Sequence, residues 1–246
     1  MSARLRQALL EQVRFLHELG VEALPLPARS ASAGISAVSA PPARPHINRP
    51  ATLPPVPLDG ALGQVREEMG ECTRCSLAAS RTHIVFGVGD PSADLMFVGE
   101  GPGQEEDQRG EPFVGRAGQL LDRMIAAIGL QREQVYIANI VKCRPPDNRN
   151  PQEDEIRSCL GFLAAQIQAV QPRAMVALGK VAASVLLEEN IAITRCRGQM
   201  RSYQGIPLMP TYHPAYLLRQ YTRENRQAVF DDLLAVKALV DQARNG

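Results

Sequence analysis

The segment DLMFVGEGPGQEED (94–107) joins an unbroken apolar run to a glycine-rich turn. A short run of this kind is typical of a strand that is buried on both faces, as in a parallel sheet. Similar runs return downstream at 135–141, 174–179 and 206–211, and helical patterns occur at 119–130, 155–170 and 223–243. The alternation predicts an α/β domain with a central, mostly parallel four-stranded sheet flanked by helices.

The sequence before this domain has a different composition. Residues 1–22 carry leucines and a valine at helical spacing, which predicts one amphipathic helix. Residues 23–58 are dominated by Pro, Ala and Ser, which predicts a disordered linker, and the folded domain is expected to span 59–246. Two roles for the helix stay open: it docks a protein partner, or it packs on its own domain.

The overall composition sets broad limits on function. The chain has 246 residues, and its 45% hydrophobic content suffices for one domain with an appendage. The net charge of +1, from 27 basic and 26 acidic residues, gives no global attraction to nucleic acid, so such binding would need a local patch. Charged residues interrupt the N-terminal stretch, which argues against a signal peptide or a membrane span and favours a cytoplasmic protein.

Four of the five cysteines form a candidate metal site. Cys72 and Cys75 make a C-x₂-C pair, while Cys143 and Cys159 lie far downstream, where the fold must bring them in. Four thiolates can hold iron–sulfur or zinc, and the spacing alone does not choose between them. Buried apolar cysteines without a ligand role are the alternative. The odd number of cysteines argues against a disulfide framework.

The loops that follow the predicted strands carry the other candidate residues, because ligands of parallel sheets bind at the carboxyl ends of the strands. Glycines in the stretch 99–122 let the backbone approach a ligand closely, although a loop that is merely rich in turn residues remains the alternative. Neither G-x-G-x-x-G nor G-x-x-x-x-G-K-[ST] occurs, which disfavours a dinucleotide or P-loop site.

Two further strand ends carry polar side chains. Asn139 ends the second strand, and its amide offers both a donor and an acceptor to a base edge. His213 follows the last strand, and the residues after it form an apolar tip that suits insertion into a base stack. An isolated Asn or His would more often be an ordinary polar residue.

These segments resemble the family 4 uracil-DNA glycosylases, the iron–sulfur branch of that superfamily, over about residues 60 to 243. The resemblance depends on CTRC (72–75), GEGPGQEED (99–107), EPFVGRAGQLLD (111–122), ANIVKCRPP (138–146), the Cys159 helix and YHPAYLLR (212–219). It implies a three-layer sandwich and an enzyme that hydrolyses the N-glycosidic bond of uracil in DNA, in base excision repair.

The resemblance also assigns roles to residues. Cys72, Cys75, Cys143 and Cys159 would ligate a 4Fe-4S cluster. The uracil pocket would comprise Gly101, Gly103, Phe113, Asn139 and His213. The catalytic groups would be His213, Glu100 and Glu106, and the DNA contacts would be Lys142, Arg144, Tyr216, Leu217 and Arg219. Cys196 matches no motif and is expected to be a free thiol.

The expected partner is uracil-containing DNA, single- or double-stranded, bound by a monomer in the nucleoid of a prokaryotic cytoplasm. No membrane association is expected. A non-catalytic iron–sulfur module that binds DNA or senses damage is the alternative function, and a zinc-bound structural protein is a third.

Overall fold

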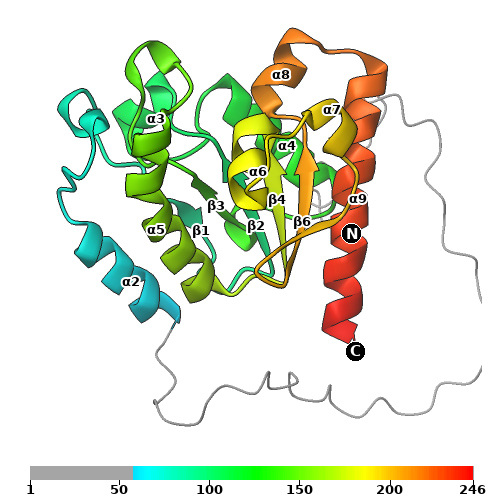
Figure 1. The fold of residues 1–246 in the computed structure, drawn as a ribbon. Helices are drawn as coiled ribbons and strands as arrows, with labels where there is room; N and C mark the ends of the chain where they lie inside the picture. Colours follow the sequence, from blue (N-terminus) through cyan, green and yellow to red (C-terminus); the bar gives the residue numbers. More distant parts are fainter. Residues whose placement is uncertain (1–57, 246) are drawn as a thin grey trace, which may run out of the picture.

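The computed structural model describes residues 58–245, which form a mixed sheet with helices on both faces (Figure 1). The sheet has six strands in the order β1-β3-β2-β4-β6-β5. The strand bounds are β1 Val88–Gly89, β2 Leu95–Gly99, β3 Tyr136–Asn139, β4 Ala174–Leu178, β5 Arg201–Tyr203 and β6 Ile206–Thr211.

The predicted α/β class and the four predicted strands are confirmed. β2 pairs in parallel with β3 and β4, and β4 pairs in parallel with β6. The sheet has two strands more than the four that were predicted, because β1 and β5 add an antiparallel strand at each edge. Both edge strands are short and incompletely buried, so neither gives the unbroken apolar run that marks a central strand.

Helices cover the two faces of the sheet and make two cores, which gives three layers. Met96 and Val98 of β2 point into the core formed with α2, α5 and α6, whereas Leu95 and Phe97 point into the core formed with α4 and α9. This alternation follows from the two-residue period of a strand. The helix bounds are α2 Leu58–Met69, α3 Gln104–Arg109, α4 Arg116–Ala127, α5 Glu153–Val170, α6 Gly179–Leu187, α7 Ile193–Cys196, α8 Pro214–Arg219 and α9 Arg223–Asn245, with 3-10 turns η1 Ser76–Ala79, η2 Arg132–Gln134 and η3 Pro146–Asn148.

The helix predicted at 1–22 and the linker predicted at 23–58 lie outside the described residues, apart from Leu58 at the start of α2. Within residues 58–245, every helix is too short or too polar to cross a lipid bilayer.

Candidate active site and cysteine cavity

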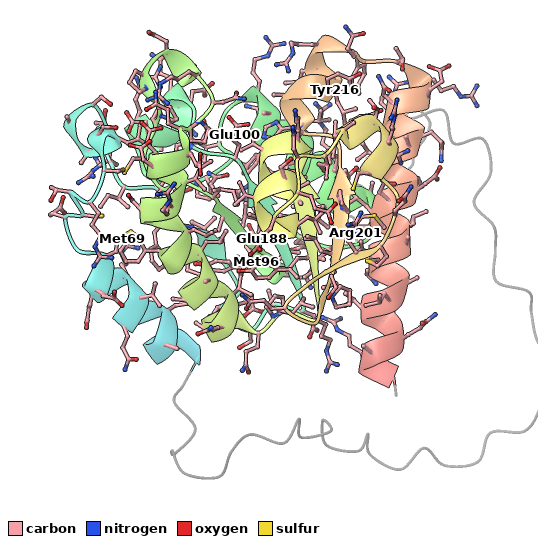
Figure 2. All side chains as sticks on the ribbon, in the orientation of Figure 1. Met69, Met96, Glu100, Glu188, Arg201 and Tyr216 are labelled. Carbon is pink, nitrogen blue, oxygen red and sulfur yellow. The ribbon has the colours of Figure 1, made fainter. Side chains whose placement is uncertain are left out.

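A cleft of about 590 Å³ opens at the carboxyl ends of the parallel strands. The register pairs Gly99 with Asn139 and Leu178 with Thr211. The loops that follow these strands therefore meet at the same end of the sheet, where the parallel strands have their carboxyl termini. Figure 2 shows Glu100 and Tyr216 at this end of the molecule. The predicted residues that line the cleft are Glu100, Gly101, Gly103, Glu106, Phe113, Asn139, His213, Tyr216 and Arg219.

Asn139 and Phe113 meet at the inner end of the cleft, across Gly99. A Cβ atom at Gly99 would lie 2.4 Å from Asn139 Oδ1 and 2.6 Å from Phe113 Cζ, so only glycine leaves room for both side chains. Asn139 is 1% exposed, and its Oδ1 atom has no hydrogen-bond partner in the described part of the chain. A buried polar atom without a partner is costly, which indicates that a ligand supplies the missing partner.

His213 is the N-cap of α8, and this position fixes its tautomer. Its Nδ1 atom accepts a hydrogen bond from the Ala215 backbone N–H at 3.1 Å, so the proton of the neutral ring is on Nε2. Burial, aided by the positive charge of Arg219 and opposed by Glu106, lowers the pKa of His213 to about 4. The ring lies 5.6 Å from the Phe113 ring, centroid to centroid. The cleft therefore contains a neutral imidazole with one N–H donor.

The two predicted carboxylates have different environments. Glu106 Oε1 accepts the backbone N–H groups of Val114 and Gly115, both at 2.9 Å, and its Oε2 accepts that of Gly103 at 3.1 Å. Glu106 thereby joins two loops of the cleft. Glu100 lines the same cleft, and burial raises its pKa. Desolvation thus makes the charged form of Glu100 less favourable in the cleft than in water.

The four motif cysteines line one small cavity between α2 and α5. Two N–H groups point at their sulfur atoms: Arg81 Nη1 lies 3.5 Å from Cys143 Sγ, and the Lys142 backbone nitrogen lies 3.3 Å from Cys159 Sγ. Burial raises the pKa of the Cys143 thiol to about 11, and burial also raises the pKa of the Cys159 thiol above its ordinary value. Within residues 58–245, no three of the His, Cys, Asp and Glu side chains converge closely enough to hold a single metal ion.

Comparison with known proteins agrees with this architecture. The model of the uracil DNA glycosylase superfamily matches residues 86–235. A type-4 uracil-DNA glycosylase of Thermotoga maritima is 44% identical over 178 residues, which is 72% of this chain and 93% of the relative. The chain belongs to the type-4 uracil-DNA glycosylases. The enzyme of that name from Sulfurisphaera tokodaii is 43% identical over 73% of this chain and 84% of the relative, and that from Archaeoglobus fulgidus is 41% identical over 69% and 90%.

Two of the residues that the sequence predicted as DNA contacts of this glycosylase are buried in the structure. Lys142 is 1% exposed, and its Nζ donates to the Asn139 carbonyl oxygen at 2.8 Å and to Gln166 Oε1. Leu217 is 2% exposed, because the predicted apolar tip folds as α8 and turns this side chain into the core with α4 and α9. Neither side chain is available to a DNA strand in this conformation.

The remaining predicted contacts lie in or near the cleft of the glycosylase. Arg144 is half-buried in the loop beyond β3, where its Nε donates to Asn148 Oδ1 at 2.8 Å. Lys180 and Arg149 also line the cleft, which the sequence did not predict. The signal for Lys180 was its position directly after the predicted strand at 174–179. Arg149 gave a weaker signal, as one basic residue of a proline-rich loop.

Proposed function

We propose that this chain excises uracil from DNA by hydrolysing the N-glycosidic bond, and that the base enters the pocket formed by Asn139, Phe113 and His213. The observation that carries the proposal is the buried Oδ1 of Asn139, which lies next to Gly99 and Phe113 and has no hydrogen-bond partner among residues 58–245. An amide in such a site rejects a base whose edge does not match, because a mismatch leaves buried polar groups without partners.

Phe113 supports the flipped base by stacking. Its ring closes one side of the pocket next to Gly99, and a base held against an aromatic face gains stacking energy whatever its polar pattern. Phe113 therefore holds the base, while Asn139 selects it. The base leaves the duplex to reach them, and residues at the rim of the cleft, such as Tyr216, are placed to fill the gap.

His213 acts on the leaving base. As the bond between the sugar and uracil breaks, the electron pair goes to the base and negative charge collects on its carbonyl oxygens. The Nε2–H of a neutral ring donates to the oxygen that gains charge, and since the Ala215 N–H holds Nδ1, the donor is already oriented. No proton need be transferred from the ring for this stabilisation.

Glu100 completes the reaction in this proposal. The sugar becomes cation-like as the bond lengthens, and a carboxylate in the same cleft opposes that charge and orients the attacking water. The water oxygen bonds to the sugar and the water loses one proton, while the uracil anion takes up one proton, so the products are neutral uracil and an abasic site. Glu106 has a different role from the one expected, since three backbone N–H groups already occupy its oxygens. It shapes the cleft.

We assign the four cysteines of the cavity to a 4Fe-4S cluster. Four thiols and two N–H groups directed at sulfur suit such a group, whose ligands bind different irons and need not converge on one ion as zinc requires. A bound cluster would supply a cross-link between the turn after α2, the loop after β3, and α5. Cys72, Cys75, Cys143 and Cys159 would hold it.

Lys180 and Arg219 bring positive charge to the lining of the cleft, and Arg149 lines it as well, although its guanidinium is paired with Glu155. This local patch suits a DNA backbone although the chain as a whole is nearly neutral. The proposed partner is uracil-containing DNA, bound by one copy of the chain.

The test is a single-turnover assay on an oligonucleotide with one uracil, followed by alkaline cleavage of the abasic site. The wild-type protein should produce one cut at the uracil, and Asn139→Ala should lose most of this activity. Asn190→Ala is the matched control, because Asn190 is exposed and lies outside the residues that line the cleft. Uncut uracil-containing DNA at saturating protein would exclude the proposed function.

A further inference from the structure

Phe113 has a backbone conformation that a non-glycine residue rarely adopts, with φ at 54°. Such strain persists only where surrounding groups hold it, and it concentrates at functional sites. Here the strained residue is the one that the proposed function assigns to base stacking. The groups that hold its backbone therefore determine where its ring stands.

Arg132 is the side chain that reaches this backbone. It lies in η2, and its guanidinium donates to the carbonyl oxygens of two consecutive residues, Pro112 and Phe113. The Nη1 to Phe113 O distance is 3.2 Å, and the same Nη1 lies 2.9 Å from Asp122 Oδ1 in α4. Asp122 thus binds the Arg132 guanidinium on one side. The planar set of N–H donors of Arg132 spans the two carbonyl oxygens on the other side.

Two other contacts leave the loop little freedom. Glu106 accepts the N–H groups of Val114 and Gly115, directly after the strained residue. Gly118 of α4 also packs against this backbone, so closely that a Cβ atom at Gly118 would lie 1.9 Å from the Phe113 carbonyl oxygen. Glu106 and Gly118 restrain the chain after Phe113, and Arg132 restrains the carbonyls at and before it.

We propose that Arg132 is a positioning residue for base recognition: it holds the strained backbone of Phe113 so that the ring faces the flipped uracil. This inference rests on the proposed function. It differs from a general stabilising role, because a freed Phe113 backbone relaxes toward an ordinary φ and moves the ring out of the pocket while the sheet and the DNA-binding rim stay in place.

The experiment compares three measurements: inhibition by free uracil, the single-turnover rate, and binding to DNA that contains an abasic-site analogue with no base to stack. In Arg132→Met, uracil inhibition and the rate should each weaken by about tenfold or more, the scale of a lost base–aromatic stack. Binding of the analogue should stay within about threefold of wild type. Arg132→Lys, which cannot span both carbonyls, should show the same pattern to a smaller degree, and it serves if the Met variant does not fold.

Two control variants separate the hydrogen bonds from Arg132 to the two carbonyl oxygens from its ion pair with Asp122. Asp122→Asn removes the charge pair but leaves the guanidinium free to donate to the carbonyls, so it should have a smaller effect than Arg132→Met. Arg173→Met removes a similar arginine that pairs with Asp94 and donates to the Ala243 carbonyl at the opposite end of the sheet. It should leave uracil inhibition unchanged.

The inference is overturned if both Arg132 variants match wild type in uracil inhibition and rate, or if all three measurements fall together. The Phe113→Ala variant shows whether a negative result comes from the positioning role of Arg132 or from the role assigned to Phe113. If that variant weakens uracil inhibition while the Arg132 variants do not, only the positioning role fails. If Phe113→Ala itself leaves uracil inhibition unchanged, the assignment of Phe113 in the proposed function fails.

Discussion

His213 combines two properties that suit a group acting on a leaving anion. It is neutral at physiological pH, and the Ala215 N–H orders its ring so that Nε2–H faces the cleft. A neutral donor placed where charge develops stabilises the transition state more than the bound substrate. The residue should therefore matter for bond cleavage more than for affinity.

His213→Ala should lower the single-turnover rate by about two to three orders of magnitude, the usual scale for losing one such donor. Affinity for uracil-containing DNA should change only a few-fold. His83→Ala is the control, since His83 pairs with the Asp107 carbonyl oxygen through its Nδ1 and should affect neither quantity. A collapse of affinity with an unaltered rate on saturated enzyme would instead make His213 a DNA-positioning residue.

The lowered pKa of His213 predicts a specific pH dependence. Because its pKa falls from 6.5 to about 4 on folding, the ring stays neutral across mildly acidic pH, and the part of the activity loss that comes from His213 should begin only as pH approaches 4. Between these values the unfolded chain binds more protons, so this residue makes the free energy of unfolding decrease as pH falls. The single-turnover rate of Glu100→Gln, measured as a function of pH, should show only the decrease that protonation of His213 causes, because this variant has no carboxylate to protonate at position 100. An acid limb centred at the ordinary histidine pKa would contradict the assignment.

The sequence located Glu100, Asn139 and His213 because each of them ends or follows an apolar run. Parallel strands bring their carboxyl ends together, so residues at these positions meet. The sequence misjudged Lys142, since a charged residue after a strand looks exposed. Pairing continues past β3, however: Val141 N–H donates to the Glu100 carbonyl oxygen, and Val85 N–H donates to that of Lys142. The backbone stays in the interior there, and no single-sequence pattern reports a tertiary partner such as Gln166.

At the scale of elements, the cleft depends on loops that are tied to one another rather than on the strands alone. Glu106 of α3 binds backbone groups on both sides of the cleft, at Gly103 and at Val114 and Gly115. The sequence predicted a loop at 99–122, and the structure contains α3 and the start of α4 within it. The sequence predicted a catalytic role for Glu106 because it does not reveal that the hydrogen-bond partners of this side chain are backbone N–H groups.

A matched pair of substitutions should separate the two carboxylates. Glu106→Gln replaces an acceptor oxygen by an NH₂ group, which cannot accept from the loop, so it should lower the free energy of unfolding by about 1–3 kcal/mol. Glu100→Gln should leave stability equal or slightly higher at neutral pH, because burial disfavours the charged form of Glu100, yet it should reduce the single-turnover rate. Urea unfolding and rate measurements on both proteins check this. The reverse pattern would exchange the two roles.

The edge strands and α8 show where element prediction fails. β1 and β5 are held by pairing with a neighbour and not by a buried apolar face, so their sequences carry little period-two signal. The apolar residues after His213 predicted an exposed tip, but Leu217 packs beneath the cleft against the α4 and α9 core. The pattern records that side chains are apolar, whereas the surrounding fold decides whether they turn inward.

At the scale of the whole molecule, the cysteine cavity joins segments that are distant in the sequence. A ligand lost from such a site releases a cross-link as well as a metal bond. Cys143→Ser should therefore lose iron and sulfide and unfold at a lower temperature. Cys196→Ser is the matched control, since Cys196 is also buried but lies outside the cavity, and it should keep both. Iron and sulfide analysis with thermal unfolding checks the pair, and an iron-replete, fully stable Cys143→Ser protein would refute the ligand assignment.

The cysteines of the cavity come from only one part of the fold. They lie in the turn after α2, the loop after β3, and α5, while β4, β6 and α9 contribute none. Proteins open in cooperative units, so removing iron should accelerate amide hydrogen exchange in α2, α5 and the 140–150 loop and leave β4, β6 and α9 protected. Equal acceleration everywhere would show that the cluster stabilises the fold as one unit. With unequal exchange, oxidative damage to the proposed 4Fe-4S cluster would loosen the segment next to Asn139 before it reached His213. A partly damaged enzyme would then lose its choice of base sooner than its capacity to cleave the bond.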